Sequence, residues 1–168
     1  MVPSRTRLVN EVLSLTGRPD RTTDRTRKSI ELAVLAASEL NSTVIDSRHL
    51  LCGLVREGEG VACHILRRLG LNQERLEQMV AELPASGDAS LPRVDEDMSA
   101  AIQACWTLAT SMHHNYIGTE HVLLAIAGSQ SRARELLRLL GIEGKVIASD
   151  IRNLLRIPPE PPDSPSPD

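Results

Sequence analysis

The stretch VIDSRHLLCGLVREGEGVACHILRRLGL, residues 44–71, decides the fold because a second version of it occurs later in the chain. That second version is YIGTEHVLLAIAGSQSRARELLRLLGI, residues 116–142. Aligning His49 with His121 matches the apolar positions of the two copies at a spacing of about 72 residues, with a one-residue deletion in the second copy. An internal repeat of this kind indicates a domain built from two copies of one supersecondary unit.

The spacing of apolar residues predicts four helices in each copy. The amphipathic stripe at i, i+3, i+4 and i+7 is formed in the first helix by Ile30, Ala33, Val34 and Ala37. The predicted helices cover residues 24–40, 47–57, 60–69 and 72–83 in the first copy, and 95–113, 119–127, 129–140 and 143–155 in the second.

Polar residues and glycines mark the ends of these helices. Side chains that accept a hydrogen bond from a free amide are typical N-caps, and we predict them at Asp24, Ser47, Asn72, Asp95 and Thr119. Glycine commonly closes a helix in the left-handed conformation, which we predict for Gly70 and Gly141.

The composition favours closely packed helices over strands. Trp106 and Tyr116 are the only aromatic residues, so the core must consist of Leu, Ile, Val and Ala. One copy of roughly 60 residues buries too little surface to be stable alone. We therefore expect an all-α fold, in which two four-helix repeats pack into one eight-helix domain with pseudo-twofold symmetry.

The domain organisation follows from the repeat and its flanks. We expect an N-terminal extension over residues 1–22 that carries one helix at Arg5–Leu15, repeat one over 23–83, a linker over 84–94 and repeat two over 95–157. Residues 158–168 form a tail in which six of eleven residues are proline, so we expect this tail to be extended and disordered.

Charge and cysteine content point away from several classes of protein. The net charge of −3 gives no drive toward nucleic acid. The three cysteines, Cys52, Cys63 and Cys105, form no C-x-x-C pair and fit buried thiols in a reducing compartment. No run of 18 apolar residues and no secretory leader is present, so we expect a cytoplasmic monomer without membrane contact.

The repeat also resembles a known family. The sequence YIGTEHVLLAI at 116–126 resembles the signature of the Clp ATPase N-terminal domain, and GLVREGEGVA at 53–62 resembles another part of it. The resemblance covers about residues 22–156. It implies a domain that receives substrates and adaptor proteins for an ATPase ring and that, in Clp members of Gram-positive bacteria, captures proteins tagged with phosphoarginine. No G-x-x-x-x-G-K-[ST] motif occurs, so we expect the recognition domain without the ring.

The resemblance also implies binding residues. In the family, each repeat supplies a Thr at the start of its first helix and the Glu of Gly-Thr-Glu-His. The first copy has Thr23 but Arg48 in place of Glu, and the second has Glu120 but Asp95 in place of Thr. Arg48 repels a guanidinium and Asp95 repels a phosphate, so we predict that phosphoarginine binding is lost or very weak. Roles as helix caps or dipole partners account equally for Thr23, Asp95 and Glu120.

The remaining polar residues do not form a recognisable catalytic or metal-binding set. His49 and His121 are equivalent across the repeat and are expected to do the same structural job twice, and no H-E-x-x-H spacing is present. Cys63–His64 and Cys52 with His49 lack an oxyanion loop. The Arg-rich faces around Arg67 and Arg132 are expected to be solvated surface, with an acidic docking partner as the alternative. We expect no catalytic residue, metal or cofactor.

Two functions remain after these exclusions. The first is a non-catalytic module that binds a Clp ATPase, a peptidase, or adaptor or substrate proteins, acting as adaptor, decoy or accessory subunit. Similar domains accompany Clp proteases in plastids, which supports the accessory role by analogy alone. The second is a sensor in which the altered pockets around Arg48 and Glu120 bind an anion or a modified amino acid.

Overall fold

The structure is a computed structural model that describes residues 4–83 and 92–156. Its α-helices are α1 (Arg5–Leu15), α2 (Asp24–Glu39), α3 (Ser47–Glu57), α4 (Val61–Arg68), α5 (Gln73–Glu82), α6 (Glu96–Ser111), α7 (Thr119–Gly128), α8 (Arg132–Leu139) and α9 (Gly144–Leu154). A 3-10 turn, η1 (Pro19–Arg21), and two short strands, β1 (Val44–Ile45) and β2 (Arg93–Val94), complete the described elements.

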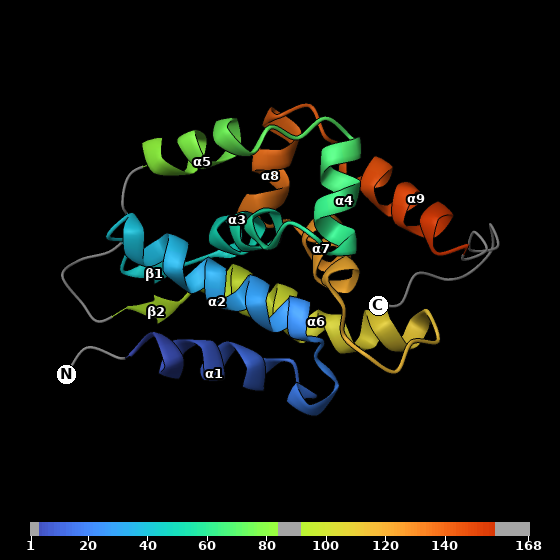
Figure 1. Cartoon of the computed structure of the whole chain (residues 1–168), viewed down its shortest axis with the longest axis horizontal. Helices are drawn as coiled ribbons and strands as arrows, with labels where there is room; N and C mark the ends of the chain where they lie inside the picture. Colours follow the sequence, from blue (N-terminus) through green and yellow to red (C-terminus); the bar gives the residue numbers. More distant parts are fainter. Residues whose placement is uncertain (1–3, 84–91, 157–168) are drawn as a thin grey trace.

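The helices form the two predicted repeats. Repeat one contains α2 to α5 and repeat two contains α6 to α9, and in each repeat the first two helices pack on each other, α2 on α3 and α6 on α7 (Figure 1). Helices of the two repeats also pack directly on each other, α3 on α8 and α4 on α7. This packing between the repeats confirms the all-α double-repeat fold and the expectation that the two halves share one core.

A glycine allows helices α2 and α3 to pack closely against each other. Gly53 of α3 faces α2, where a Cβ at Gly53 would overlap the carbonyl oxygen of Ser29 and lie 2.9 Å from the amide nitrogen of Ala33. The equivalent residue of repeat two is Ala125, so the second repeat accommodates the methyl group that the first excludes. The two repeats therefore share their helix order but differ in the residue at this contact.

Helix α1 belongs to the same core as the repeats. Its apolar face buries Leu8, Val9, Val12 and Leu13, and the helix packs on α2, α6 and β2 (Figure 1). After α1, the guanidinium of Arg18 stacks over the ring of Trp106 at 4.8 Å from the ring centre and ties the η1 turn to α6. The helix predicted at residues 5–15 is thus present and adds a ninth α-helix to the described part of the domain.

Two parallel backbone pairings join the start of each repeat to the segment before the second helix of the other repeat. Strands β1 and β2 pair Val44 with Arg93 and Ile45 with Val94, and a single bridge pairs Thr22 with Ile117. The pairing was not expected from the sequence, and it turns residues 93–94 of the predicted linker into a strand. The rest of that linker, from 84 to 91, and the Pro-rich tail lie outside the described residues.

Most helix ends agree with the predictions to within two residues, but three caps lie one residue earlier. The observed N-caps are Thr23, Asp46 and Gly118, where Asp24, Ser47 and Thr119 were predicted. Asn72 caps α5 as predicted, whereas Asp95 occupies the cap position of α6 without a side-chain cap bond. Gly70 and Gly141 have φ values of +92° and +83°, which confirms the left-handed closures. Within the described ranges, no helix is both long and apolar enough to cross a membrane.

Candidate functional site

Two assemblies each bring three helix starts together, two from one repeat and one from the other. The hydroxyl of Thr119 at the start of α7 accepts a hydrogen bond from the amide of Ala62 in α4, at 3.2 Å. The equivalent Ser47 of α3 accepts from the amide of Ala133 in α8, at 2.9 Å. The third helix start is α2 in the first assembly and α6 in the second, held by the bridge at Thr22 and by the β1–β2 pair.

The first assembly forms an open cleft of about 390 Å³, which we call the Glu120 cleft. Residues of α2, α4 and α7 and of the segment before α7 line it: Thr23, Asp24, Arg25, Val61, Tyr116, Gly118, Thr119 and Glu120. Because free amides and the positive end of the helix dipole gather at a helix start, such a convergence favours an anionic group.

Glu120 supplies a buried carboxylate to this cleft. Its residue exposure is 4%, and its carboxylate lies against Gly118, where a Cβ would overlap it. No ion pair within 4 Å joins Glu120 to a cationic side chain of the described residues. Burial, the charge of Glu120 and a side-chain hydrogen bond to it raise the pKa of Tyr116. A buried carboxylate without a cation favours a ligand that brings one.

Two further charged residues, Arg25 and Asp24, line the cleft. Arg25 binds the carboxylates of Glu57 at 3.4 Å and Glu59 at 3.1 Å, and its side chain is half exposed. Asp24 follows the cap Thr23 and is exposed. The cleft therefore offers both signs of charge within one small space, which fits a zwitterionic group better than a simple anion.

The second assembly is filled by its own side chains, and we call it the Arg48 cluster: Asp46, Ser47, Arg48, Asp95, Asp97 and Arg132. The Nε of Arg48 donates to both carboxylate oxygens of Asp46 at 3.0 and 3.1 Å, and its Nη2 completes a bidentate pair. Arg132 reaches the same carboxylate at 3.3 Å and Asp95 at 3.4 Å. Ser47 donates to Asp97 at 2.6 Å, so the acids and the arginines satisfy one another.

Burial and ion pairing shift the pKa of Asp46, in the Arg48 cluster, in opposite directions. Burial raises the pKa of Asp46, but the hydrogen bonds from Arg48 and its positive charge outweigh burial and hold this pKa below its ordinary value. The pKa of Arg48 is raised, first by its bond to Asp46. Both groups therefore stay charged and paired at neutral pH.

The structure corrects the way in which the sequence analysis paired the candidate residues. Thr23 was paired with Arg48 and Asp95 with Glu120 within each repeat, whereas the structure brings Thr23 together with Glu120 and Asp95 together with Arg48. Because each assembly combines helix starts from both repeats, the Glu120 cleft has both of the residues that the resemblance implies, and the Arg48 cluster has neither. The two like-charge clashes thus fall in the same place, the Arg48 cluster.

Other residues of the two sites were missed by the sequence analysis. Tyr116 and Arg25 line the Glu120 cleft, and Asp46 and Arg132 complete the Arg48 cluster. A signal was available in the repeat alignment, because Gly118 is replaced by Asp46 at the position directly before the helix. At these positions the two assemblies differ in the charge of their side chains.

The repeated histidines have the same structural role, as predicted. The Nδ1 of His49 accepts from the amide of Asp46 at 3.0 Å, and the Nδ1 of His121 accepts from Gly118 at 2.8 Å. The neutral ring of His121 must then carry its proton on Nε2, which lies 2.8 Å from Nδ1 of His114. His114, Glu120 and His121 place ligand atoms within 4.8 Å of one another, but this tautomer leaves His121 without a free lone pair for a metal.

Burial of His121 predicts a loss of stability in mild acid. Burial, followed by the charge of His114, lowers the pKa of His121 from 6.5 to about 4. The unfolded chain therefore binds a proton at His121 more readily than the folded chain does. The stability that neutral His121 contributes is fully present above pH 6.5 and is lost as the pH falls toward 4. We expect the free energy of unfolding, measured with urea, to be roughly 2 kcal/mol lower at pH 5 than at pH 7.

The control for this prediction is His121→Asn, whose Oδ1 keeps an acceptor near the place of Nδ1 but does not titrate. The variant should lose the part of this pH dependence that His121 contributes, and the part from His49, whose pKa burial also lowers, should remain. An equally steep dependence in both proteins would contradict the assignment to His121.

The cysteines are poor nucleophiles. Burial raises the pKa of Cys52 and of Cys105 to about 12, and it also raises the pKa of Cys63. The thiol of Cys63 donates to the carbonyl of Val55 at 3.4 Å. A thiol with a raised pKa forms little of the reactive thiolate at neutral pH, which supports the prediction of buried structural cysteines.

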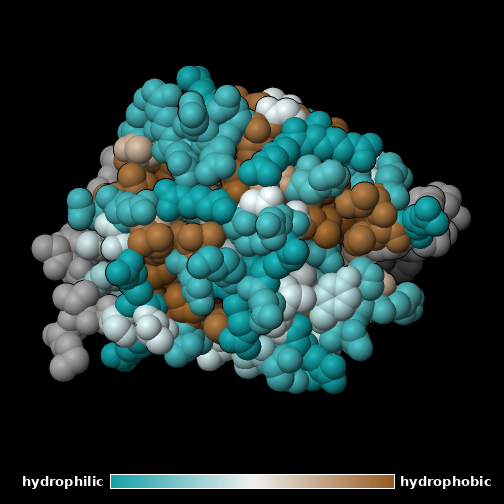
Figure 2. Space-filling view, in the orientation of Figure 1, coloured by the Kyte–Doolittle hydropathy of each residue, from teal (hydrophilic) through white to brown (hydrophobic). Residues whose placement is uncertain are grey.

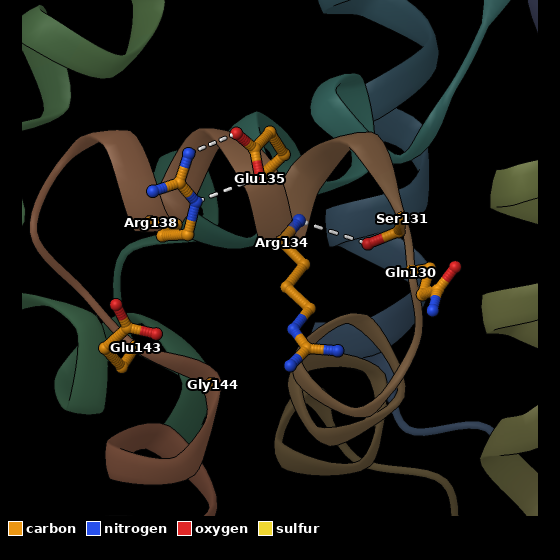
Figure 3. A pocket seen from close by; sticks show the side chains of 7 residues that line it. All are labelled: Gln130, Ser131, Arg134, Glu135, Arg138, Glu143 and Gly144. Atoms are coloured by element: carbon orange, nitrogen blue, oxygen red, sulfur yellow. Dashed lines mark hydrogen bonds and ion pairs between the residues drawn. The ribbon is translucent and has the colours of Figure 1, made fainter.

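Two further hollows are visible on the surface. A pocket of about 290 Å³ lies between α8 and the start of α9, where Arg138 pairs with Glu135 and the Arg134 side chain extends separately (Figure 3). Arg134 donates to the carbonyl of Ser129 at 3.3 Å, so much of this Arg-rich face is paired within the chain. A groove of about 360 Å³ between α1 and α2 has an apolar floor, and Figure 2 shows apolar side chains gathered there among hydrophilic ones.

Together, the fold and the two assemblies define an all-helical domain of two interlocked repeats, with an open cleft at one junction and a filled one at the other. The sequence model of the Clp repeat (R) N-terminal domain matches residues 21–140 and 93–167. The chain belongs to this family of Clp N-terminal domains.

Individual relatives agree with that membership. The chain is 33% identical over 141 residues to a probable ATP-dependent Clp protease ATP-binding subunit of Chlamydia pneumoniae, covering 79% of this chain. It is 33% identical over 138 residues, or 80% of this chain, to the negative regulator of genetic competence ClpC/MecB of Bacillus subtilis. The chain spans 16% and 17% of the lengths of these two relatives. A solved complex of a ClpV N-domain with a VipB peptide has a similar fold, with a TM-score of 0.68, 16% identity and coverage of 93% of this chain and 96% of that one.

Proposed function

We propose that the chain is a non-catalytic protein-binding module of a Clp-type chaperone or protease system, and that its Glu120 cleft receives a phosphorylated arginine side chain of a partner protein. The observation that carries the proposal is the buried, cation-free carboxylate of Glu120 at the meeting point of three helix starts. A guanidinium fits that carboxylate through charge-assisted hydrogen bonds. The attached phosphate then lies toward the helix starts, which attract anions.

The comparisons support the protein-binding part of this proposal. The relatives are Clp proteins, and the solved ClpV N-domain complex contains a peptide. We therefore place the partners among Clp ATPases, peptidases, adaptors and their substrates. A small-ligand sensor gains no support from these relatives, and the buried thiols offer no nucleophile for an enzyme.

The prediction that phosphoarginine binding is lost now applies to the Arg48 cluster alone. Glu120 and Thr23 are both present in the open cleft, where neither like-charge clash occurs. The α1–α2 groove offers a second surface for the polypeptide that carries the modified arginine. Its lining combines apolar residues, among them Val9, Leu13 and Leu35, with the basic residues Arg27 and Lys28.

Calorimetric titration with small ligands tests the proposal. Free phosphoarginine should bind at least about tenfold more tightly than arginine or phosphoserine, because each of these lacks one of the two charged groups that the cleft pairs. An arginine-phosphorylated protein should likewise be retained on the immobilised chain and released by phosphoarginine. Equal retention of the same protein after dephosphorylation, together with no heat from phosphoarginine, would contradict the proposal.

A further inference from the structure

The Arg48 cluster and the Glu120 cleft are equivalent places in the two repeats, yet one is filled and the other is open. Arg48 stands where the other repeat has Glu120, and Asp46 stands where it has Gly118. Both places nevertheless contain a carboxylate in front of the helix. In the cleft it is the Glu120 carboxylate, which lies where a side chain of Gly118 would begin, and in the cluster it is Asp46 itself.

The difference lies in what this carboxylate binds. The carboxylate of Asp46 is 1% exposed and holds the guanidinium of Arg48 in a bidentate pair, in which the Arg48 side chain is 14% exposed. Arg48 also donates its backbone amide to Asp46 at 2.9 Å, which fixes the side chain and the helix start together. The carboxylate in the cluster therefore has the partner that the carboxylate of Glu120 lacks.

Three more replacements close the cluster. Val61 at the start of α4 corresponds to Arg132 at the start of α8, and Arg132 bridges Asp46 and Asp95. Thr23 corresponds to Asp95, and Arg25 corresponds to Asp97, which accepts from Ser47 and from the amide of Arg132. Each replacement adds a group that bonds within the cluster, so the space becomes an internal ion-pair network.

We propose that Arg48 is a built-in ligand, whose guanidinium permanently occupies the second site of this domain and leaves one site, the Glu120 cleft, for a partner. The chain consequently binds one phosphoarginine rather than two; this stoichiometry rests on the proposed function, whereas the occupation of the second site does not. Arg48 thereby determines how many modified arginines one domain holds, and it removes the avidity that two sites would give.

Stoichiometry tests the first consequence. Calorimetric titration of the wild-type chain with phosphoarginine should give one site per chain, and Glu120→Gln should remove it. The variant D46G/R48E/D95T/D97R/R132V places in the cluster the residue types that the open cleft has at the equivalent positions, and it should give two sites. Two sites in the wild-type chain, or one in this variant when it is folded, would overturn the proposal.

Rescue by guanidinium ion tests the occupation itself, without any ligand of the Glu120 cleft. The variant Arg48→Ala should melt at a lower temperature than the wild type and should regain roughly 2–4 °C in millimolar guanidinium chloride relative to equal sodium chloride. The wild type and D46N/R48A should not respond. If Arg48→Ala responds no more than the wild type, Arg48 is not a built-in ligand; if the rescue succeeds but no phosphoarginine binds, the proposed function fails instead.

Discussion

Gly53→Ala should destabilise the domain by about 3 kcal/mol, because the added methyl group has no space between the two central helices of repeat one. The groups that it would meet are the backbone carbonyl of Ser29 and the amide of Ala33, which cannot rotate away as a side chain can. Helix α3 would have to move away from α2, and both helices carry residues of the sites at their starts. Urea unfolding at neutral pH measures the loss.

Gly128→Ala is the matched control for this substitution. A Cβ at Gly128, the last residue of α7, meets nothing within 4 Å. We expect a change of roughly zero to 1 kcal/mol in the stabilising direction, since alanine loses less conformational freedom on folding than glycine. Equal effects of the two substitutions would show that the α2–α3 contact is looser than the structure indicates.

Glu120→Gln should reduce the affinity for phosphoarginine at least about 30-fold, since removing one partner of a buried charge pair costs 2 kcal/mol or more. The variant keeps the size and shape of the side chain, so the free domain should fold normally. Its melting temperature should be unchanged or slightly raised, because the substitution removes a buried charge that has no cationic partner in the described structure.

Asp95→Asn is the control for Glu120→Gln. It neutralises a carboxylate of the equivalent Arg48 cluster, and it should leave the affinity unchanged while lowering the melting temperature slightly through the lost contact with Arg132. If Asp95→Asn lowers the affinity and Glu120→Gln does not, phosphoarginine binds at the Arg48 cluster, which contradicts the proposed function.

Much of the fold could be predicted from the sequence because helices and repeats have local signals. The first and last residues of α1 and α3 were predicted correctly, because each helix has a single amphipathic stripe and a clear signal at its end. Caps were less certain because two polar residues stand side by side at several starts, as at Thr23 and Asp24. The two-residue strands β1 and β2 were missed because so short a segment shows no alternation.

The candidate site was harder to predict, and the reason is geometric. The repeat alignment correctly identified the equivalent residues, such as Arg48 and Glu120. The alignment does not show which residues of the other repeat each of them contacts. In the structure, Thr23 of repeat one and Glu120 of repeat two line the same cleft although they are 97 positions apart in the sequence. A tertiary arrangement of this kind is visible only once the packing of α3 on α8 and of α4 on α7 is known.

The central claim is that one cleft, formed across the repeats, recognises the partner's modified arginine. The most direct test is to follow the backbone amide resonances of the wild-type chain by NMR during a titration with phosphoarginine. The account predicts saturable shifts concentrated at Thr23, Arg25, Val61 and Glu120, with little change at Asp46, Arg48 and Arg132. Shifts concentrated at the Arg48 cluster, or none in either place, would contradict it.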